Sequence, residues 1–419
     1  MTERLLQYIW QYSFYQPAQL MTTDNLVVQV AYPGLSNTNQ GPDFLNAKIK
    51  IGGTTWVGSV EIHINSSEWN DHKHSSDNNY NNVILHVVWN EDLKINLPFP
   101  TLVLQDRVSK VLLSRYEEIM CTAGFIPCEQ HIHKIDAVVF TLWKERLLIE
   151  RLQLRTGSIN EMLNNNSIDW EATLWWMLAR NFGLKVNSDS FEKIAHSIPV
   201  KILAKHKNQI HQLEALLLGQ AGTLDKHFSE SYPNMLRKEY DYLRKKYGLI
   251  KIHYPLYYLR MRPANFPTVR LAQLAALIHS SKHLFSNILS AEKVNELRQF
   301  LNITANDYWH YHYLFDEATA FSKKNLGKQM IDNIIINTCI PIVYAYGYYH
   351  NNENHKAKAI GWMRELPAEK NLITKGFENL KMENKNAHDS QALLHLKRNY
   401  CDNRHCLNCA VGNAVLKQG

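Results

Sequence analysis

The sequence has few of the features that mark export, membrane insertion or disorder. Its 419 residues include only 17 Gly and 13 Pro, while 45% are hydrophobic, which argues against long disordered or low-complexity tracts. No segment approaches the run of about eighteen apolar residues that a membrane helix needs. The first fifteen residues contain Glu3 and Arg4 and lack the apolar stretch of a secretory signal. These absences predict a cytoplasmic protein that does not bind a membrane.

The charge is of modest size, and the chain is too long for a single hydrophobic core. A net charge of +7 permits an anionic partner such as nucleic acid without requiring one. A chain of this length predicts two or more domains. Nothing in the composition indicates an oligomeric state.

The first third of the chain carries strand patterns. Residues 25–32, 44–51, 54–64 and 83–89 are strand-like, and residues 3–15 have the spacing of a short amphipathic helix. Gly52-Gly53 is a two-residue hairpin signal between two of these strands. Residues 1–125 therefore predict a small domain with a mostly antiparallel sheet.

The rest of the chain carries helix patterns. From Asp136 onward apolar residues recur every three or four positions, with Asp169 as a predicted N-cap and Gly183 as a predicted helix end. The pattern predicts an all-helical domain over residues 136–390 and a cysteine-containing tail over residues 391–419. The predicted fold class is therefore α+β, a small mixed-sheet domain followed by a larger helical one.

Acidic and imidazole side chains converge on the predicted hairpin. Pro42-Asp43 opens one strand, and Glu61 and His63 lie two apart on the next, so they project from the same face. Carboxylates meeting there suit Mg²⁺ or Mn²⁺, which bind through one or two carboxylates and substrate phosphate oxygens. A histidine beside them can orient the attacking water. The ordinary alternative is a turn cap at Asp43 with Glu61 and His63 on the wet face of a sheet.

This arrangement resembles the PD-(D/E)XK nuclease superfamily, in which Pro-Asp on one strand is followed by Glu-Xaa-Lys on the next. The resemblance implies a restriction-endonuclease-like fold, with Asp43 and Glu61 as metal ligands and Glu3 as a further acid. His63 stands where that pattern has lysine. The replacement of lysine by histidine is compatible with a modified or lost activity.

A histidine cluster follows the hairpin. The run from Trp69 to Asp77 contains His72 and His74 two residues apart, with Asp77 three residues later. Imidazoles and a carboxylate so arranged suit phosphate binding or, together with His63 and His86, a transition metal. The alternative is that these are loop residues without a ligand. The neighbouring His86, inside a continuous apolar strand, is predicted to be a core histidine.

Arginines flank a proline-rich turn in the helical half. Arg262 and Arg270 surround Pro263 and Pro267 just before a predicted helix, where they suit contacts with phosphates. The alternative is a rigid corner between helices, with the arginines paired to carboxylates.

Cysteine is scarce, and half of it falls in one run. Cys401, Cys406 and Cys409 form a Cys-x₄-Cys-x₂-Cys pattern. Because clustered cysteines in a reducing compartment suggest metal ligation, the run predicts a zinc or iron–sulfur site. A fourth ligand is needed, and Cys128 is the natural candidate, with His405 as the other. The alternative is a set of reduced thiols in a small helical cap.

Several segments together are identified as typical of an uncharacterised bacterial family, domain-of-unknown-function family 2851. The segments are NQGPDF, GSVEIH, the Trp69–Asp77 run, ILHVVW, RPANFPTVRLAQLA and the cysteine run. The resemblance brings no activity with it, so function rests on the residues. Three hypotheses stay open: a metal-dependent nuclease acting on DNA or RNA, a non-enzymatic helical scaffold with a degenerate nuclease fold, and a zinc-dependent hydrolase at the histidines.

Overall fold

The computed structural model describes residues 1–72, 74, 77–251 and 254–417. The chain forms two compact units, and the division falls inside one long helix, α4 (Ala137–Asn165). The first unit joins Met1–Trp143 to the chain from Leu396 onward, and the second comprises Lys144–His395. The tail that the sequence sets apart as residues 391–419 thus belongs largely with the N-terminal unit.

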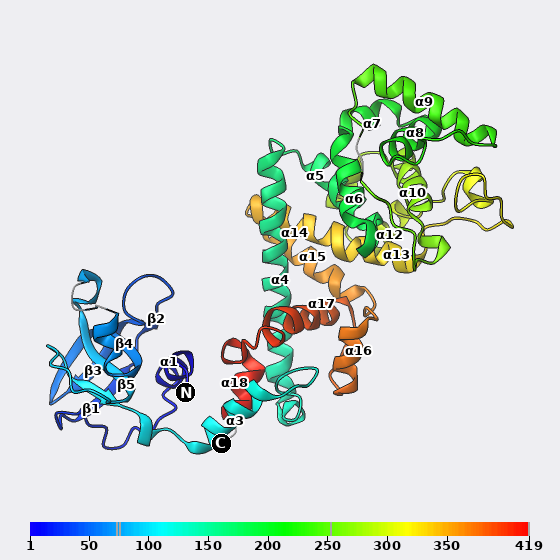
Figure 1. The fold of residues 1–419 in the computed structure, drawn as a ribbon. Coiled ribbons are helices and arrows are strands. Elements are labelled where there is room, and N and C mark those ends of the chain that lie inside the picture. Colours follow the sequence, from blue (N-terminus) through cyan, green and yellow to red (C-terminus); the bar gives the residue numbers. More distant parts are fainter. Residues whose placement is uncertain (73, 75–76, 252–253, 418–419) are drawn as a thin grey trace. The chain divides into compact units, whose positions relative to one another are not determined.

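The first unit is built on one mixed sheet in the order β1-β3-β4-β5-β6, with β2 paired to β3 (Figure 1). Its strands are β1 (Val28–Tyr32), β2 (Leu35–Ser36), β3 (Phe44–Ile51), β4 (Thr54–Asn65), β5 (Val83–Asn90) and β6 (Thr101–Val103). The pairs β1–β3, β2–β3 and β3–β4 are antiparallel, whereas β4–β5 and β5–β6 are parallel. The sheet therefore has fewer antiparallel pairs than the sequence predicts. The connection through α2 (Glu68–Asp71) returns the chain to the end of the sheet at which β4 begins, so β5 runs parallel to β4.

The predicted hairpin and opening helix are confirmed. Gly52 and Gly53 have φ of +56° and +98°, conformations that glycine adopts without strain, and they join β3 to β4. Helix α1 (Glu3–Gln11) packs against β4 through a fully buried apolar face. Trp10 at its end is buried and donates its indole N–H to the carbonyl of Pro33 at 3.0 Å. The packing places the first turn of α1 beside the mouth of the hairpin.

The second unit is helical, as the apolar periodicity predicts (Figure 1). It contains most of α4, from Lys144 onward, followed by α5 (Trp170–Phe182), α6 (Leu184–Ser197), α7 (Val200–His206), α8 (Ile210–Gln220), α9 (Ser231–Tyr247), α10 (Pro267–Ser280), α11 (Leu284–Ser290), α12 (Val294–Phe300), α13 (Lys328–Ile334), α14 (Ile340–Tyr349), α15 (Glu353–Glu365), α16 (Leu372–Asn379) and α17 (Ala387–His395). Asp169 caps α5 by accepting the N–H of Ala172 at 2.9 Å, and Gly183 ends that helix.

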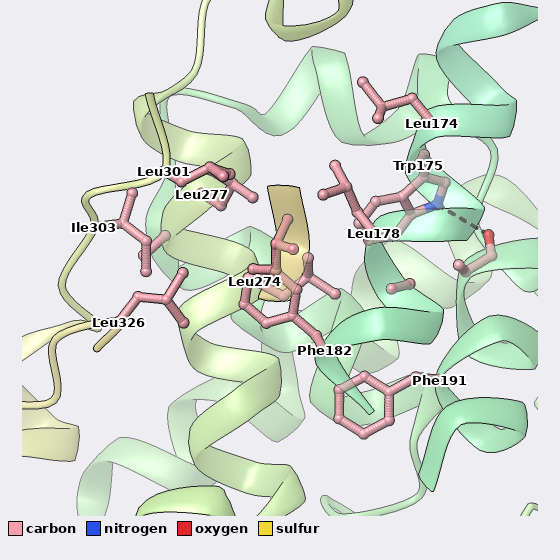
Figure 2. Close-up of a cluster of buried hydrophobic side chains, with 14 of the residues drawn as sticks. Leu174, Trp175, Leu178, Phe182, Phe191, Leu274, Leu277, Leu301, Ile303 and Leu326 are labelled. Atoms are coloured by element: carbon pink, nitrogen blue, oxygen red, sulfur yellow. Dashed lines mark hydrogen bonds between the residues drawn. The ribbon is translucent and has the colours of Figure 1, made fainter. Parts of the chain in front are cut away.

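The core of the second unit is continuous, and Figure 2 shows part of it. Trp175 and Phe182 of α5 are buried among leucines of α5 and α10, and Phe191 of α6 lies beside them. The buried indole N–H of Trp175 donates to the carbonyl of Ala195 at 3.1 Å, so this polar group keeps a partner in the core.

One helical stretch, Lys328–Tyr349, is long and apolar enough to cross a membrane. However, 83% of its most apolar window is buried inside the protein, as in the core helix of a soluble protein. The stretch is explained by packing within the helical unit.

Adding a methyl group at Gly219 of α8 is expected to destabilise the protein. A Cβ at this position would lie 2.2 Å from ring atoms of Tyr240 on α9, whose hydroxyl donates to Gln220 at 2.8 Å. Gly219→Ala should therefore cost about 1–3 kcal/mol of unfolding free energy by overpacking. The matched control is Gly157→Ala in α4, where nothing lies within 4 Å of the new Cβ. Denaturant unfolding should find the control equal to or slightly more stable than the native protein, and equal losses in both would contradict the prediction.

Candidate active site at the hairpin of β3 and β4

The register of the hairpin brings Asp43 and Glu61 together. Phe44 pairs with Val60, so Asp43, directly before β3, lies beside Glu61 on β4. The backbone N–H of Asp43 donates to Glu61 Oε2 at 3.1 Å, and the N–H of Ile62 donates to Asp43 Oδ2 at 3.1 Å. These reciprocal bonds fix the orientation of both carboxylates and leave lone pairs on their oxygens for a further ligand.

Helix α1 adds a third acid to the pair. The side-chain amide of Gln7 donates to Asp43 Oδ1 at 2.9 Å and to Glu3 Oε1 at 3.1 Å. Glu3 and Gln7 lie one helical turn apart and therefore share a face of α1. One amide group thus bridges Glu3 and Asp43.

The carboxyl groups are difficult to ionise together. Burial, and next the neighbouring Glu3, raise the pKa of Asp43 to about 6. Burial, and next Asp43, raise the pKa of Glu61 to about 9. Two carboxylates in a low-dielectric site repel each other, so without a cation one proton remains on the pair at neutral pH.

Imidazoles line the other side of Glu61. His63 Nε2 and His74 Nε2 lie 3.5 and 3.3 Å from Glu61 Oε1. The ring of His63 also contacts two further imidazoles: its Nε2 is 3.2 Å from His72 Nδ1, and its Nδ1 is 2.9 Å from His86 Nε2. Glu61 and His63 project from one face of β4, as their spacing predicts.

Two of these imidazoles, His63 and His86, are neutral at neutral pH. Burial, and next the neighbouring His86, lower the pKa of His63 to about 3. Burial, and next His74, lower the pKa of His86 to about 4. His63 therefore carries no charge at neutral pH, unlike the lysine of the PD-(D/E)XK pattern, and presents a ring nitrogen to a proton, a water or a metal.

Two aromatic rings support the histidines. Tyr80 stacks on His74 with ring centroids 4.0 Å apart, and Trp69 lies edge-on to His63, His74 and His86. His74 Nε2 is buried and has no hydrogen-bond partner, although it faces the Glu61 carboxylate. A buried nitrogen without a partner is one that a water or cation would satisfy.

The structure brings most of the predicted site residues together. Asp43, Glu61, His63, His72 and His74 form one cluster, and three of them, His63, His72 and His74, offer ligand atoms within 4.8 Å of one another. Asp77 lies next to the cluster, where it caps a short 3-10 turn by accepting the N–H of Asn79 at 2.9 Å.

The predicted arginines lie in the second unit. Arg262 is exposed, whereas Arg270 is buried and donates to the amide oxygens of Gln273 and Asn265 at 2.8 and 2.5 Å. The partners of Arg270 are therefore amides, not the carboxylates expected for a rigid corner between helices. The role of the two arginines in substrate binding stays a prediction.

Three residues of the site were given no role by the sequence analysis, namely Gln7, Trp69 and Tyr80, and a fourth, His86, was assigned to the core. Gln7 follows Glu3 by one helical turn, and this spacing is the one signal that could have pointed to it. His86 was assigned to the core, and it is fully buried, yet it also bonds to His63. Its position follows from the parallel pairing of Glu61 with His86, which the sequence did not predict.

Comparison with known proteins gives a family and no function. The family model described as protein of unknown function (DUF2851) matches residues 3–372, which include the whole hairpin site and leave out the C-terminal cysteines. No curated protein and no solved structure matches the chain. Because the match spans most of the sequence, the chain belongs to the DUF2851 family.

Proposed function

We propose that this protein is a divalent-metal-dependent hydrolase of phosphodiester bonds in DNA or RNA. The observation that carries the proposal is a pair of carboxylates, the half-buried Asp43 and the buried Glu61, held together by reciprocal hydrogen bonds beside a neutral histidine. The resemblance to PD-(D/E)XK nucleases supports the same assignment, and the net charge of +7 is compatible with a polyanionic substrate.

The donor set fits a hard cation. Asp43 and Glu61 would hold Mg²⁺ or Mn²⁺ through carboxylate oxygens, with Glu3 near enough to bind through water. When bound, such an ion polarises phosphoryl oxygens and lowers the pKa of water. Gln7 and the N–H of Ile62 orient Asp43, as the partners of metal ligands do.

His63 has a positioning role in this proposal. Its Nδ1 bonds to His86, which fixes the ring, and its Nε2 faces Glu61 and His72. A neutral ring nitrogen there accepts a hydrogen bond from the attacking water. Because His63 supplies no positive charge, we expect a stronger dependence on the cation than a lysine-containing site has.

The test is cleavage of labelled single- and double-stranded DNA and RNA by the native protein. We expect cleavage of at least one substrate with Mg²⁺ or Mn²⁺ and none after addition of a chelator. Binding of nucleic acid without cleavage would favour the degenerate scaffold. If the protein neither binds nor cleaves nucleic acid, nucleic acid is ruled out as its substrate.

Cation binding should strengthen as pH rises from about 6 to about 8. The pKa of Glu61 is raised to about 9, so the ion displaces a proton from the carboxyl pair, and affinity should rise by about tenfold per pH unit for one proton released. Titration calorimetry with Mn²⁺ in buffers of different ionisation enthalpy measures the proton release. Affinity that is independent of pH would contradict a site on this pair.

A second candidate is a zinc-dependent hydrolase, favoured by the three ligand atoms of His63, His72 and His74 within 4.8 Å of one another. The bond between His63 Nδ1 and His86 fits a ligand whose other nitrogen is oriented by a partner. Metal analysis separates the candidates. Zinc that is lost in His74→Ala and kept in the control His133→Asn, an exposed histidine, would favour this candidate.

A further inference from the structure

The C-terminal cysteines form a second cluster in the first unit, with a distant partner. Cys128, Cys406 and Cys409 are 6–7% exposed, and Cys401 is half-buried. After burial, which is the largest cause, the neighbouring thiols Cys409 and Cys406 further raise the pKa of Cys128 to about 12. Burial and then Cys409, Cys128 and Cys406 raise the pKa of the Cys401 thiol as well. The four cysteines come from two segments of the first unit, residue 128 and residues 401–409.

Backbone packing places Cys128 beside the C-terminal run. The carbonyl of Cys128 accepts the N–H groups of His131 and Ile132, both at 3.0 Å, and so opens the 3-10 turn Ile132–Lys134. That turn packs against helix α18 (Ala410–Lys417), which also packs against the turn Cys406–Asn408. A Cβ at Gly412 of α18 would lie 2.2 Å from the carbonyl oxygen of Cys406. Only glycine permits this approach.

Arg404 ties the same run to helix α3 (Lys110–Cys121). Its guanidinium donates to the carbonyls of Ile119, Met120 and Thr122 at 3.1, 2.5 and 3.1 Å. These carbonyls end α3 and would otherwise lack partners. The chain between Cys401 and Cys406 is therefore held in a defined turn, with Arg404 itself at φ +52°.

This geometry is poorly explained by packing alone. A small apolar side chain would fill such a site as well as a thiol, yet the packing of two distant segments brings four cysteines into one part of the unit. Cys128, Cys401 and Cys406 form no disulfide. Thiols gathered in a buried site are the ligands that soft metals select, and the metal removes their protons.

We propose that Cys128, Cys401, Cys406 and Cys409 form a four-thiolate site for a thiophilic metal centre, either one Zn²⁺ or an iron–sulfur cluster. The centre would fasten α18 to the turn that precedes α4. It is independent of the proposed hydrolase site, because it uses none of the hairpin residues, and three of its four cysteines lie outside the residues that the family model matches.

The experiment is metal and acid-labile sulfide analysis, with a visible absorption spectrum, on full-length protein purified without oxygen. We expect about one zinc per chain, or iron with sulfide and cluster absorption, lost in Cys406→Ser and kept in Cys121→Ser. Cys121 is the matched control because it is exposed at the end of α3. Native protein that holds neither metal and takes up neither Zn²⁺ nor a reconstituted cluster would overturn the proposal, as would full metal content in Cys406→Ser.

A second measurement on the native protein covers the case in which Cys406→Ser does not fold. Thiol labelling before and after chelation counts the protected cysteines, and limited trypsin digestion follows cleavage at Lys397, Arg398 and Arg404. We expect chelation to expose four thiols and to speed cleavage in this run. If chelation changes neither the thiol count nor the cleavage rate, the proposal is overturned, whatever the outcome of the nucleic-acid assays.

Discussion

Glu61→Gln is expected to abolish divalent-cation binding at the hairpin and at the same time to make the metal-free protein more stable. The folded protein keeps a proton on Glu61 up to about pH 9, whereas the unfolded chain releases it near the ordinary carboxyl pKa of 4.5. Stability therefore falls as pH rises between these values, since the folded state binds more protons. Glutamine needs no proton, and its amide oxygen can still accept the N–H of Asp43.

Calorimetry in the presence of chelator measures this effect. The gain in Tm of Glu61→Gln over the native protein should grow from pH 5 to pH 8 and reach roughly 2–4 °C for each kcal/mol gained. Glu91→Gln, an exposed carboxylate beyond β5, is the matched control and should show no such growth. A variant that is less stable than the native protein at both pH values would show that Glu61 is ionised and satisfied by its neighbours.

Asp389→Ala is expected to destabilise the helical unit by about 3–5 kcal/mol, because it removes the carboxylate that pairs with the buried Lys144. Lys144 Nζ of α4 lies 2.7 Å from Asp389 Oδ1 of α17, with side chains only 7% and 10% exposed. The other oxygen of Asp389 accepts the N–H of Lys385 at 3.0 Å. The pair joins two helices that lie far apart in the sequence.

The pH dependence of this effect has the opposite sign to that of Glu61. Burial raises the pKa of Asp389, but the bonds with His388 and Lys144 outweigh it and hold the pKa well below 3.8. The contribution is therefore present at neutral pH and is lost as pH falls through the folded pKa.

Denaturant unfolding at pH 7 tests the pair. Glu383→Ala removes the exposed partner of Lys385, with both side chains more than 60% exposed, and should cost under about 1 kcal/mol. The double variant Lys144→Met with Asp389→Leu should recover much of the loss, because it removes both charges of the buried pair. Equal losses in the single and double variants would assign the effect to packing.

The parts of the fold that the sequence predicted correctly depend on local patterns. The hairpin follows from two alternating strands around Gly52-Gly53, and the helices follow from apolar periodicity with caps such as Asp169. The parallel pairing of β4 with β5 was missed, since it depends on where the chain between residues 66 and 82 crosses, and no local pattern encodes that path.

The same distinction applies to the candidate site. Asp43, Glu61 and His63 were identified because the hairpin register alone brings them together. Gln7, Tyr80 and the second role of His86 depend on the packing of separate elements. The neutrality of His63 follows from burial among other imidazoles, which lowers its pKa, and burial is a property of the folded chain.

The central claim is that Asp43 and Glu61 hold a divalent cation for phosphodiester cleavage. The most direct measurement compares the native protein with Asp43→Asn in cleaving the preferred labelled nucleic acid at one Mg²⁺ concentration. We predict a loss of about 10³-fold or more, since removing one ligand charge costs several kcal/mol in the transition state. A folded Asp43→Asn protein that cleaves at the native rate would contradict the account.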